Sequence, residues 1–378
     1  MKPKLRFKEF SDEWCETTLG ETTTFKQGIQ VDVDKQFSKP FDNSVRFIRI
    51  VDYTQNTKDI RYISKPANAN YVDEHDVVLV RYGATAGFVG HGIKGVIANN
   101  MFTVTPNSNI NKDFLYTILK QDKIYNKLNS SNGSSAMPAL NFGSVSILKF
   151  SYPSIDEQNK LTNLIYLLDK KIELQSKKIE DLKLFKSYTK IRLFQNGDKT
   201  IKLGDILTKW NKKNKDGLID YVESISNKFG FISQSDQFGD RNVASKDLKN
   251  YYVIEKNVFG YNPSRLNVGS LALKDNDNIS VVSPLYECFT TNQNNKFMLE
   301  WFDSIYFKRG TLSRFEGGVR NTLNFTNLCE IEINLPSIEL QNKYATYLST
   351  LDKKIKFEEQ KLNGLKNLKK GLMQNMFV

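Results

Sequence analysis

Two segments of the chain carry apolar residues at alternating steps of four and three. The first has Leu161, Ile165, Leu168, Ile172, Ile179 and Leu182, and the second has Tyr344, Leu348, Leu351, Ile355, Leu362 and Leu365. This heptad spacing predicts helices with a coiled-coil seam. An amphipathic helix packed on its own domain is the alternative. A length of about 40 residues, or about 60 Å at 1.5 Å per residue, favours the coiled coil.

The two segments are copies of one another. When Pro153 is aligned with Pro336, the match runs without a gap through the LDKKI sequences at 168–172 and 351–355. In the same alignment it extends backwards to Leu-Asn-Phe at 140–142 and 323–325. Proline suits the first turn of a helix and serine its cap, so Pro153-Ser154 and Pro336-Ser337 are predicted helix starts. A repeat this long indicates domain duplication rather than a solenoid, whose repeats run about 20 to 50 residues.

One seam position is polar in both copies, Gln175 and Glu358. A polar residue in an apolar seam costs stability but can fix the register. Two similar segments of one chain that pair with pseudo-twofold symmetry are antiparallel. We therefore expect Gln175 and Glu358 to lie close together. The full set of predicted seam residues is Leu161, Ile165, Leu168, Ile172, Gln175, Ile179, Leu182, Leu348, Leu351, Ile355, Glu358, Leu362 and Leu365.

The regions before the helices have strand character at 45–51, 76–80, 101–104, 251–254, 279–282 and 330–335, with short helices at 114–119 and 297–302. The predicted fold class is therefore α+β. Two globular α+β domains are separated by two long helices that form an antiparallel coiled coil, in a pseudo-twofold internal repeat. The predicted domains are 1–152, a helical spacer at 153–195, 196–335 and a C-terminal helical spacer at 336–378.

The chain has a formal net charge of +12 and a pI near 9.3. This excess favours an anionic partner such as nucleic acid, although it is also compatible with a basic protein whose charge only aids solubility. The helical repeats at 153–194 and 336–378 hold 17 Lys and Arg against 10 Asp and Glu. That charge suits either a solvated helix face or helices lying along DNA.

Loops rich in Lys, Arg, Asn, Gly and Tyr separate the strands, for example FKQGIQ at 25–30, RYGATAG at 81–87, GYNPSRLN at 260–267 and RFEGGVRN at 314–321. Arg pairs with guanine, Asn and Gln pair with adenine, and Lys binds phosphate. Plain turn chemistry would explain each loop taken alone. The candidate DNA-binding residues are Lys26, Gln27, Arg49, Arg81, Tyr82, Thr85, Asn262, Arg265, Arg314, Arg320 and Asn321.

No catalytic motif is found in the sequence. There is no Gly-Lys pair for a Walker A loop and no Pro-Pro for the loop of amino-methyltransferases. Two histidines, His75 and His91, are too few for the usual histidine–metal sites, so no metal is expected. The cysteines at 15, 288 and 329 are scattered, which fits a reducing cytoplasm. Neither a signal peptide nor a membrane span is visible.

The whole chain resembles the specificity (S) subunits of Type I restriction–modification systems. The resemblance is sharpest at LNFGSVSILKFSYPSIDEQNKL (140–161) and LNFTNLCEIEINLPSIELQNKY (323–344), where a Pro-x-x-x-x-Gln junction leads into each helix. The second copy departs from the family pattern by having Leu340 where the first has Glu157. Asp76–Val80 with the Gly83 loop, and Leu-Gly-Glu/Asp at 19–21 and 203–205, are further similarities.

The resemblance implies that each globular domain is a target recognition domain for one half of a gapped site on double-stranded DNA. It implies docking of two methyltransferase (M) subunits, and of restriction (R) subunits, with no membrane partner. S-adenosylmethionine, ATP and Mg are implied for those partners, and no cofactor and no catalysis for this chain. A stand-alone two-domain DNA-binding regulator is the alternative function, and a protein-binding scaffold is a third.

Overall fold

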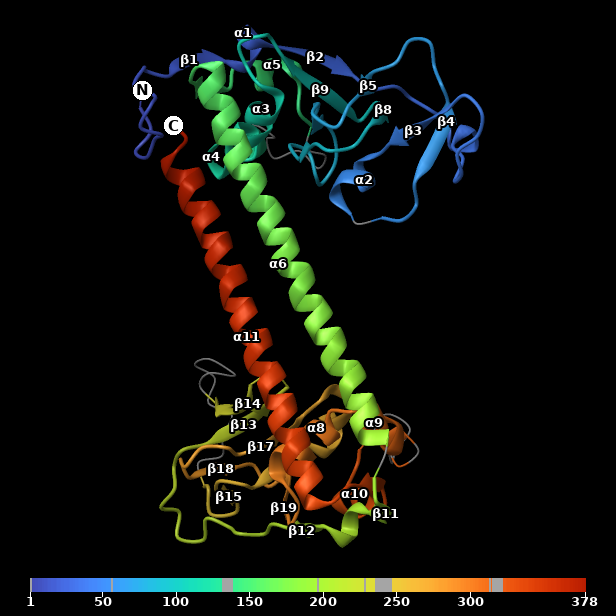
Figure 1. Ribbon diagram of the computed structural model, residues 1–378, viewed down its shortest axis with the longest axis vertical. Helices are drawn as coiled ribbons and strands as arrows, with labels where there is room; N and C mark the ends of the chain where they lie inside the picture. Colours follow the sequence, from blue (N-terminus) through green and yellow to red (C-terminus); the bar gives the residue numbers. More distant parts are fainter. Residues whose placement is uncertain are drawn as a thin grey trace. The chain divides into compact units, whose positions relative to one another are not determined.

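The computed structural model describes residues 2–55, 57–130, 139–195, 197–227, 229–234, 247–312, 314 and 322–378. The chain divides into two compact units (Figure 1). The first unit comprises Met1–Gln175 and Lys361–Val378, and the second comprises Ser176–Gln360. Within the described residues, none of the helices has both the length and the apolar character needed to cross a membrane.

The first unit contains the elements up to the first long helix, of which it holds the part up to Gln175, together with residues 361–375 of the second long helix. They are β1 (Cys15–Thr18), α1 (Leu19–Thr22), β2 (Thr23–Gln27), η1 (Val33–Lys35), β3 (Ser44–Ile48), α2 (Ile50–Thr54), β4 (Arg61–Ser64), β5 (Tyr71–Val72), β6 (Val77–Val80), β7 (Val89–Gly90), β8 (Gly95–Ile97), β9 (Met101–Pro106), α3 (Lys112–Leu119), α4 (Asp122–Ser130), α5 (Phe142–Ser146), β10 (Lys149–Tyr152) and α6 (Ile155–Gln195).

Two four-stranded sheets form the body of this unit, in the orders β2-β9-β6-β7 and β4-β3-β8-β5. Strand β6 shows why they pack together. Side chains of a strand alternate between its faces, so Val77 and Leu79 join the core that contains α3, while Val78 and Val80 join the core of the other sheet. All four residues are buried, which explains why the sequence of β6 is apolar throughout.

The second unit repeats this plan with shorter strands. Its elements are β11 (Lys199–Lys202), η2 (Leu203–Asp205), β12 (Leu207–Lys209), β13 (Glu223–Ser226), β14 (Gly230–Ser233), β15 (Tyr252–Ile254), β16 (Phe259–Tyr261), η3 (Pro263–Val268), β17 (Leu271–Leu273), β18 (Ser280–Val282), β19 (Glu287–Thr291), α8 (Asn295–Phe302), α9 (Ile305–Leu312), α10 (Phe325–Cys329), β20 (Glu332–Leu335) and α11 (Ile338–Asn375).

The sheet β12-β19-β16-β17 has the same strand order as β2-β9-β6-β7. In each unit the first strand of the globular part pairs antiparallel with the last, β1 with β10 and β11 with β20. Helices α3 and α8, α5 and α10, and α6 and α11 begin at positions that the alignment of the two copies makes equivalent. The predicted α+β class and its internal repeat are confirmed.

The long helices run antiparallel within each unit (Figure 1). In the first unit, Leu161 and Ile165 near the start of α6 share a core with Met376 and Phe377, at and just beyond the end of α11. In the second unit, Lys178 lies 2.7 Å from Glu358 and Lys186 lies 2.8 Å from Asp352.

The predicted seam positions are removed from solvent to different degrees. Those that are buried are Leu161, Ile165, Leu168, Ile179, Leu348, Leu351, Ile355 and Glu358, and those that are half-buried are Ile172, Gln175, Leu182, Leu362 and Leu365. Glu358 pairs with Lys178 in the second unit. Gln175 belongs to the first unit. The predicted meeting of Gln175 with Glu358 therefore stays a prediction.

A buried glutamine fixes each long helix to its globular part. Gln158 is fully buried; its Oε1 accepts from the Asn111 amide at 2.9 Å, and its Nε2 donates to the carbonyls of Asn109 and Pro153 at 2.9 Å. Gln341 is equally buried and accepts from the amide of Asn294 at 3.1 Å. An unpaired buried polar group is costly, so these bonds explain the Pro-x-x-x-x-Gln junction.

Some element boundaries differ from the predictions. Residues 49–51 do not continue β3, because the Asp52 carboxylate accepts from the Arg49 amide at 2.8 Å and starts α2 at Ile50. Glu330 ends α10 instead of beginning a strand. Most of the short strands were not predicted from the sequence, since two to five residues carry too little periodicity; they are β1, β2, β4, β5, β7, β8, β10, β11, β12, β13, β14, β16, β17 and β19. All three cysteines are free.

Candidate nucleic-acid interface

The loop after β6 has a backbone conformation that depends on two glycines. Gly83 and Gly87 have φ angles of +90° and +88°, which glycine adopts without steric cost. The Gly87 amide donates to the carbonyl of Val80 at 2.9 Å and closes the loop. Tyr82 is exposed and Thr85 is half-buried. The RYGATAG sequence therefore forms a tight loop that presents the Tyr82 ring to solvent.

Arg81 lies at the base of this loop and joins three elements. Its Nη1 donates to Gln27 Oε1 at 2.8 Å, and its Nε donates to the Leu140 carbonyl at 3.2 Å. Its guanidinium lies 4.9 Å from the centre of the Tyr82 ring and 5.3 Å from that of Phe142. The structure thus brings together Gln27, Arg81 and Tyr82, three of the predicted contacts.

The remaining predicted residues of the first unit are less available. Lys26 donates to the Ala69 carbonyl at 2.9 Å. The guanidinium of Arg49 is shared between Asp52, at 3.3 Å, and Asp59, at 3.2 Å. Arg61, followed by Arg49, holds the pKa of the Asp59 carboxyl below its ordinary value. Arg49 is therefore held in an ion-pair network, and a DNA contact would require part of that network to open.

In the second unit the loop after β16 takes the corresponding place. Asn262 caps η3 by accepting from the Ser264 amide at 3.0 Å. Arg265 is exposed in η3, and Gly269 ends that helix with a φ of +89°. The predicted residues Asn262 and Arg265 thus lie on one short element. Asn262 shapes its start, and Arg265 faces solvent.

The repeated Leu-Asn-Phe motif supports the loop in both units. The amide of Leu140 donates to the Arg81 carbonyl at 2.9 Å, and that of Leu323 donates to the Pro263 carbonyl at 3.1 Å. In each copy the asparagine then caps the following short helix, α5 or α10. The phenylalanine packs against aromatic side chains of the sheet. This explains why the motif repeats while the loops differ.

A cation lies over the phenylalanine of the motif in both units. In the first unit it is Arg81 over Phe142, and in the second it is Lys209 over Phe325 at 5.6 Å. Lys209 was not among the predicted contacts. A partial signal was available, because Phe325 belongs to the repeat, but Lys209 lies in a strand without sequence similarity to the first half.

The last group of predicted residues gives no assembled site. Arg314 donates to the carbonyls of Gly310, at 3.0 Å, and Glu330, at 3.1 Å, which ties it to the ends of two helices. Arg320 and Asn321 lie outside the described residues.

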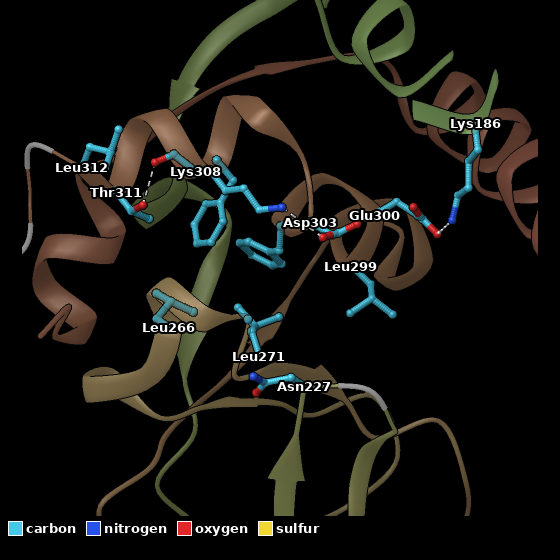
Figure 2. A pocket seen from close by; sticks show the side chains of 13 residues that line it. Lys186, Asn227, Leu266, Leu271, Leu299, Glu300, Asp303, Lys308, Thr311 and Leu312 are labelled. Carbon is cyan, nitrogen blue, oxygen red and sulfur yellow. Dashed lines mark hydrogen bonds and ion pairs between the residues drawn. The ribbon is translucent and has the colours of Figure 1, made fainter. Parts of the chain in front are cut away.

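A hollow of about 630 Å³ is lined by residues of η3, α8 and α9 in the second unit (Figure 2). Leu266, Leu271 and Leu299 form its apolar part. The charged part contains Glu300, which pairs with Lys186 at 2.8 Å and with Lys190 at 3.0 Å. Burial alone would raise the pKa of Glu300, but the charges of Lys190 and Lys186 outweigh it and hold the pKa below its ordinary value. The charges of Glu300 and the two lysines are therefore paired with one another.

Two similar globular parts, each with a polar loop supported by a repeated motif and each fixed to a long helix, define a two-domain binding protein. Comparison with known proteins agrees. The model of the Type I restriction modification DNA specificity domain matches residues 11–184 and again 197–367. The chain belongs to this family. It is therefore a DNA-recognition subunit of a Type I restriction–modification complex, the non-catalytic component of such systems.

One curated relative is the Type I restriction enzyme MjaVIII specificity subunit of Methanocaldococcus jannaschii. It is 21% identical over 402 residues, which cover 96% of this chain and 91% of the relative. The crystal structure of the S subunit of a Type I restriction–modification system from M. genitalium has a TM-score of 0.63 at 14% identity, covering 100% and 99% of the two chains.

A chain from a structural study of complex assembly and conformational transition of the type I R-M system has a TM-score of 0.58 at 13% identity. The match covers 96% of this chain and 97% of that chain. At these identities the likeness shows the shared fold. Members of the family act with other restriction–modification subunits and with DNA.

Proposed function

We propose that each unit reads one half of a gapped DNA site through the loop supported by its Leu-Asn-Phe motif. The observation that carries the proposal is the repeated support beneath different loops. Leu140 and Leu323 hold the loops by equivalent hydrogen bonds. The first loop has Arg81 at its base and exposes Tyr82, and the second has Asn262 at its start and exposes Arg265. The same supporting motif beneath loops of different sequence suits the recognition of two different half-site sequences.

The side chains of these loops are of types that can contact bases as well as phosphate. Arginine can donate two hydrogen bonds to guanine, and asparagine can pair with adenine. Gln27 is already oriented by Arg81 and by the Asn99 carbonyl, to which it donates at 2.7 Å. We propose Gln27, Arg81 and Tyr82 as the reading residues of the first unit, with Lys26, Arg49 and Thr85 in supporting positions. In the second unit we propose Asn262, Arg265 and Lys209, with Arg314, Arg320 and Asn321 as further candidates.

We further propose that α6 and α11 act as the spacer of the complex. Two methyltransferase subunits would dock on the chain, and restriction subunits would join them, in the cytoplasm. S-adenosylmethionine, ATP and Mg would be bound by those partners. The proposed parts are the recognition domains 1–152 and 196–335 and the helical spacers 153–195 and 336–378. The stand-alone regulator is not favoured by the family assignment.

The test is to map methylated adenines in a host that carries the complete system with variants of this chain. Arg81→Ala with Tyr82→Ala should relax one half of a bipartite motif and leave the other half intact. Asn262→Ala with Arg265→Ala should do the reverse. Lys149→Gln, which removes an exposed charge on β10, is the matched control and should leave both halves unchanged. Relaxation of both halves by either pair, or of neither, would overturn the assignment.

A further inference from the structure

Both histidines of the chain contact one carboxylate in the first unit. His75 lies in the turn between β5 and β6, His91 directly follows β7, and Asp113 lies in the first turn of α3. His75 Nδ1 is 3.1 Å from Asp113 Oδ1, and His91 Nε2 is 2.9 Å from the same oxygen. One ligand atom from each of the three residues lies within 4.8 Å of the others. Three separate elements thus converge on one point.

We propose that His75, His91 and Asp113 form a binding site for a divalent transition metal ion, with Zn²⁺ as the best match. Two imidazoles and a carboxylate are a common ligand set for zinc, at about 2.0–2.2 Å from the ion. Ligand atoms around a tetrahedral ion with bonds of about 2.0–2.1 Å lie about 3.3–3.4 Å apart. The Asp113 oxygen, now 3.1 and 2.9 Å from the two nitrogens, would therefore move slightly away from them to admit the ion. Ca²⁺ and Mg²⁺ prefer oxygen ligands and fit this set poorly.

The backbone around the ligands is already fixed by other contacts. The amide of His75 donates to Asp73 Oδ1 at 2.8 Å, and Lys112 bridges Asp73, at 3.1 Å, and Asp76, at 2.7 Å. The amide of Gly92 donates to the Glu74 carbonyl at 3.0 Å, which joins the loops that carry the two histidines. These bonds hold the loops near α3 without using the ligand atoms, so the site is largely pre-organised.

The surroundings also orient the rings and leave an entry path. His91 stacks on Tyr116, with 4.3 Å between ring centres and an angle of 18° between planes. Its side chain is 19% exposed, while those of His75 and Asp113 are 67% and 37% exposed. The inner ligand is therefore held in place, and the outer two are accessible to an ion from solvent.

The site belongs to the first unit alone. Both histidines lie there, and the residue of α8 that corresponds to Asp113 is Lys296, whose charge would repel a cation. A bound ion would connect the loop before β6 and the residue after β7 to helix α3. We therefore expect it to stabilise the first unit against opening and to leave the second unit unchanged.

The test is titration of the untagged, chelator-treated full chain with Zn²⁺ by isothermal calorimetry, and with Co²⁺ by visible absorption. We expect one saturable ion per chain and Co²⁺ bands typical of nitrogen and oxygen ligands. His91→Ala and Asp113→Asn should each weaken binding at least about 10-fold. The control Asp42→Asn, an exposed carboxylate of the same unit, should bind as the unchanged chain does.

A second readout guards against misfolding of these variants. Zn²⁺ should raise the unfolding temperature of the unchanged chain and slow hydrogen exchange in peptides of residues 71–92, but not in those of 251–291. His75→Ala, at the exposed edge of the site, should remove both effects while the chain remains folded. Absence of saturable binding, or binding unchanged in all three ligand variants, would show that the three residues form only a hydrogen-bonded cluster and would overturn the proposal. DNA recognition does not depend on this result.

Discussion

The two units build equivalent lysine-rich grooves beside their long helices, which differ in how far the lysines are paired with acidic residues. In the first unit the groove is lined by Lys120, Lys123, Lys366, Lys369 and Lys370, with Asp122 and Asp169. In the second it is lined by Lys183, Lys186, Lys190 and Lys308, with Asp303 and Asp352. Lys369 and Lys186 occupy equivalent positions in the two copies of the repeat, and so do their partners Asp169 and Asp352.

The difference comes from one helix in each unit. Helix α8 presents Glu300 and Asp303, whereas α3 has Thr117 and Lys120 at the corresponding positions. Glu300 and Asp303 bind Lys186 and Lys190, so the lysines of the second groove are engaged. The first groove keeps a larger positive excess. Duplication thus preserved the buried framework, while the surface charges changed.

The largest expected effect concerns a contact that exists in one unit only. Arg6 binds Glu157 through two hydrogen bonds of 2.8 and 2.7 Å, and the Glu157 side chain is 1% exposed. Arg6→Ala leaves a buried carboxylate without its cation and should destabilise the first unit by about 3 kcal/mol. Urea unfolding followed by hydrogen exchange of each unit measures this.

The second copy supplies the control for that experiment, because Leu340 occupies the position of Glu157. Combining Arg6→Leu with Glu157→Leu should recover most of the lost stability, since no buried charge is then left unpaired. If the double variant is as unstable as Arg6→Ala, the first unit depends on the ion pair itself and not only on the neutralisation of Glu157.

The next effect concerns the Pro-x-x-x-x-Gln junction, which occurs once in each unit. Gln158→Ala leaves the Asn111 amide and two carbonyls without their partner and should cost about 2–3 kcal/mol. Gln341→Ala should cost less, because one partner of Gln341 is the side chain of Gln293, which can turn toward water. Midpoints of urea unfolding for each unit provide the comparison. Equal losses would show that the mobility of Gln293 is unimportant.

A smaller effect is expected from the charged groove of the second unit. Glu300→Gln removes the carboxylate shared by Lys186 and Lys190 and should cost about 1–2 kcal/mol at pH 7. Asp169→Asn, in the first groove, is the control and should cost less than about 0.5 kcal/mol, because its partner Lys369 forms an exposed pair with it.

The same pair of variants gives a pH dependence. The folded-state pKa of Glu300 is held below its ordinary value of 4.5, so its contribution is fully present above that value and is lost as the pH falls through the lowered pKa. The unchanged chain and Glu300→Gln should therefore differ most at neutral pH, and the difference should shrink below pH 4.5 and vanish below the lowered pKa of Glu300. A constant difference across pH 3–7 would contradict the role of the Glu300 charge.

The smallest effects on stability are expected at the two stacked cations. Lys209→Gln should cost less than about 1 kcal/mol, because an exposed cation–π contact contributes little. Arg81→Gln should cost somewhat more, about 1 kcal/mol, because it also removes the hydrogen bonds to Gln27 and to the Leu140 carbonyl. Their effect should appear instead in DNA binding by the assembled complex, measured by fluorescence anisotropy over a range of salt concentrations. A loss of stability in Lys209→Gln well beyond that of an exposed cation–π contact would indicate that this cation supports the loop rather than reading DNA.

The sequence alone determined the repeat, the long helices and the family. A heptad pattern sustained over several turns is a local signal, and the ungapped alignment of the two copies fixed which of their parts correspond. Helices α3 and α8 were predicted within two residues of their starts. The Leu-Asn-Phe and Pro-x-x-x-x-Gln motifs were recognisable as sequence repeats, but the sequence did not show that they support the loops and attach the long helices.

Only the tertiary structure decided which polar side chains act together. The contact of Arg81 with Gln27 spans 54 residues, and that of Gln158 with Asn111 spans 47. His75, His91 and Asp113 come from a turn, a strand end and a helix. No periodicity joins such residues, because long-range contacts depend on how sheets and helices pack. The same packing decided which candidates are available for contact. Arg49 and Arg314 are held by local partners, whereas Tyr82 and Arg265 face solvent.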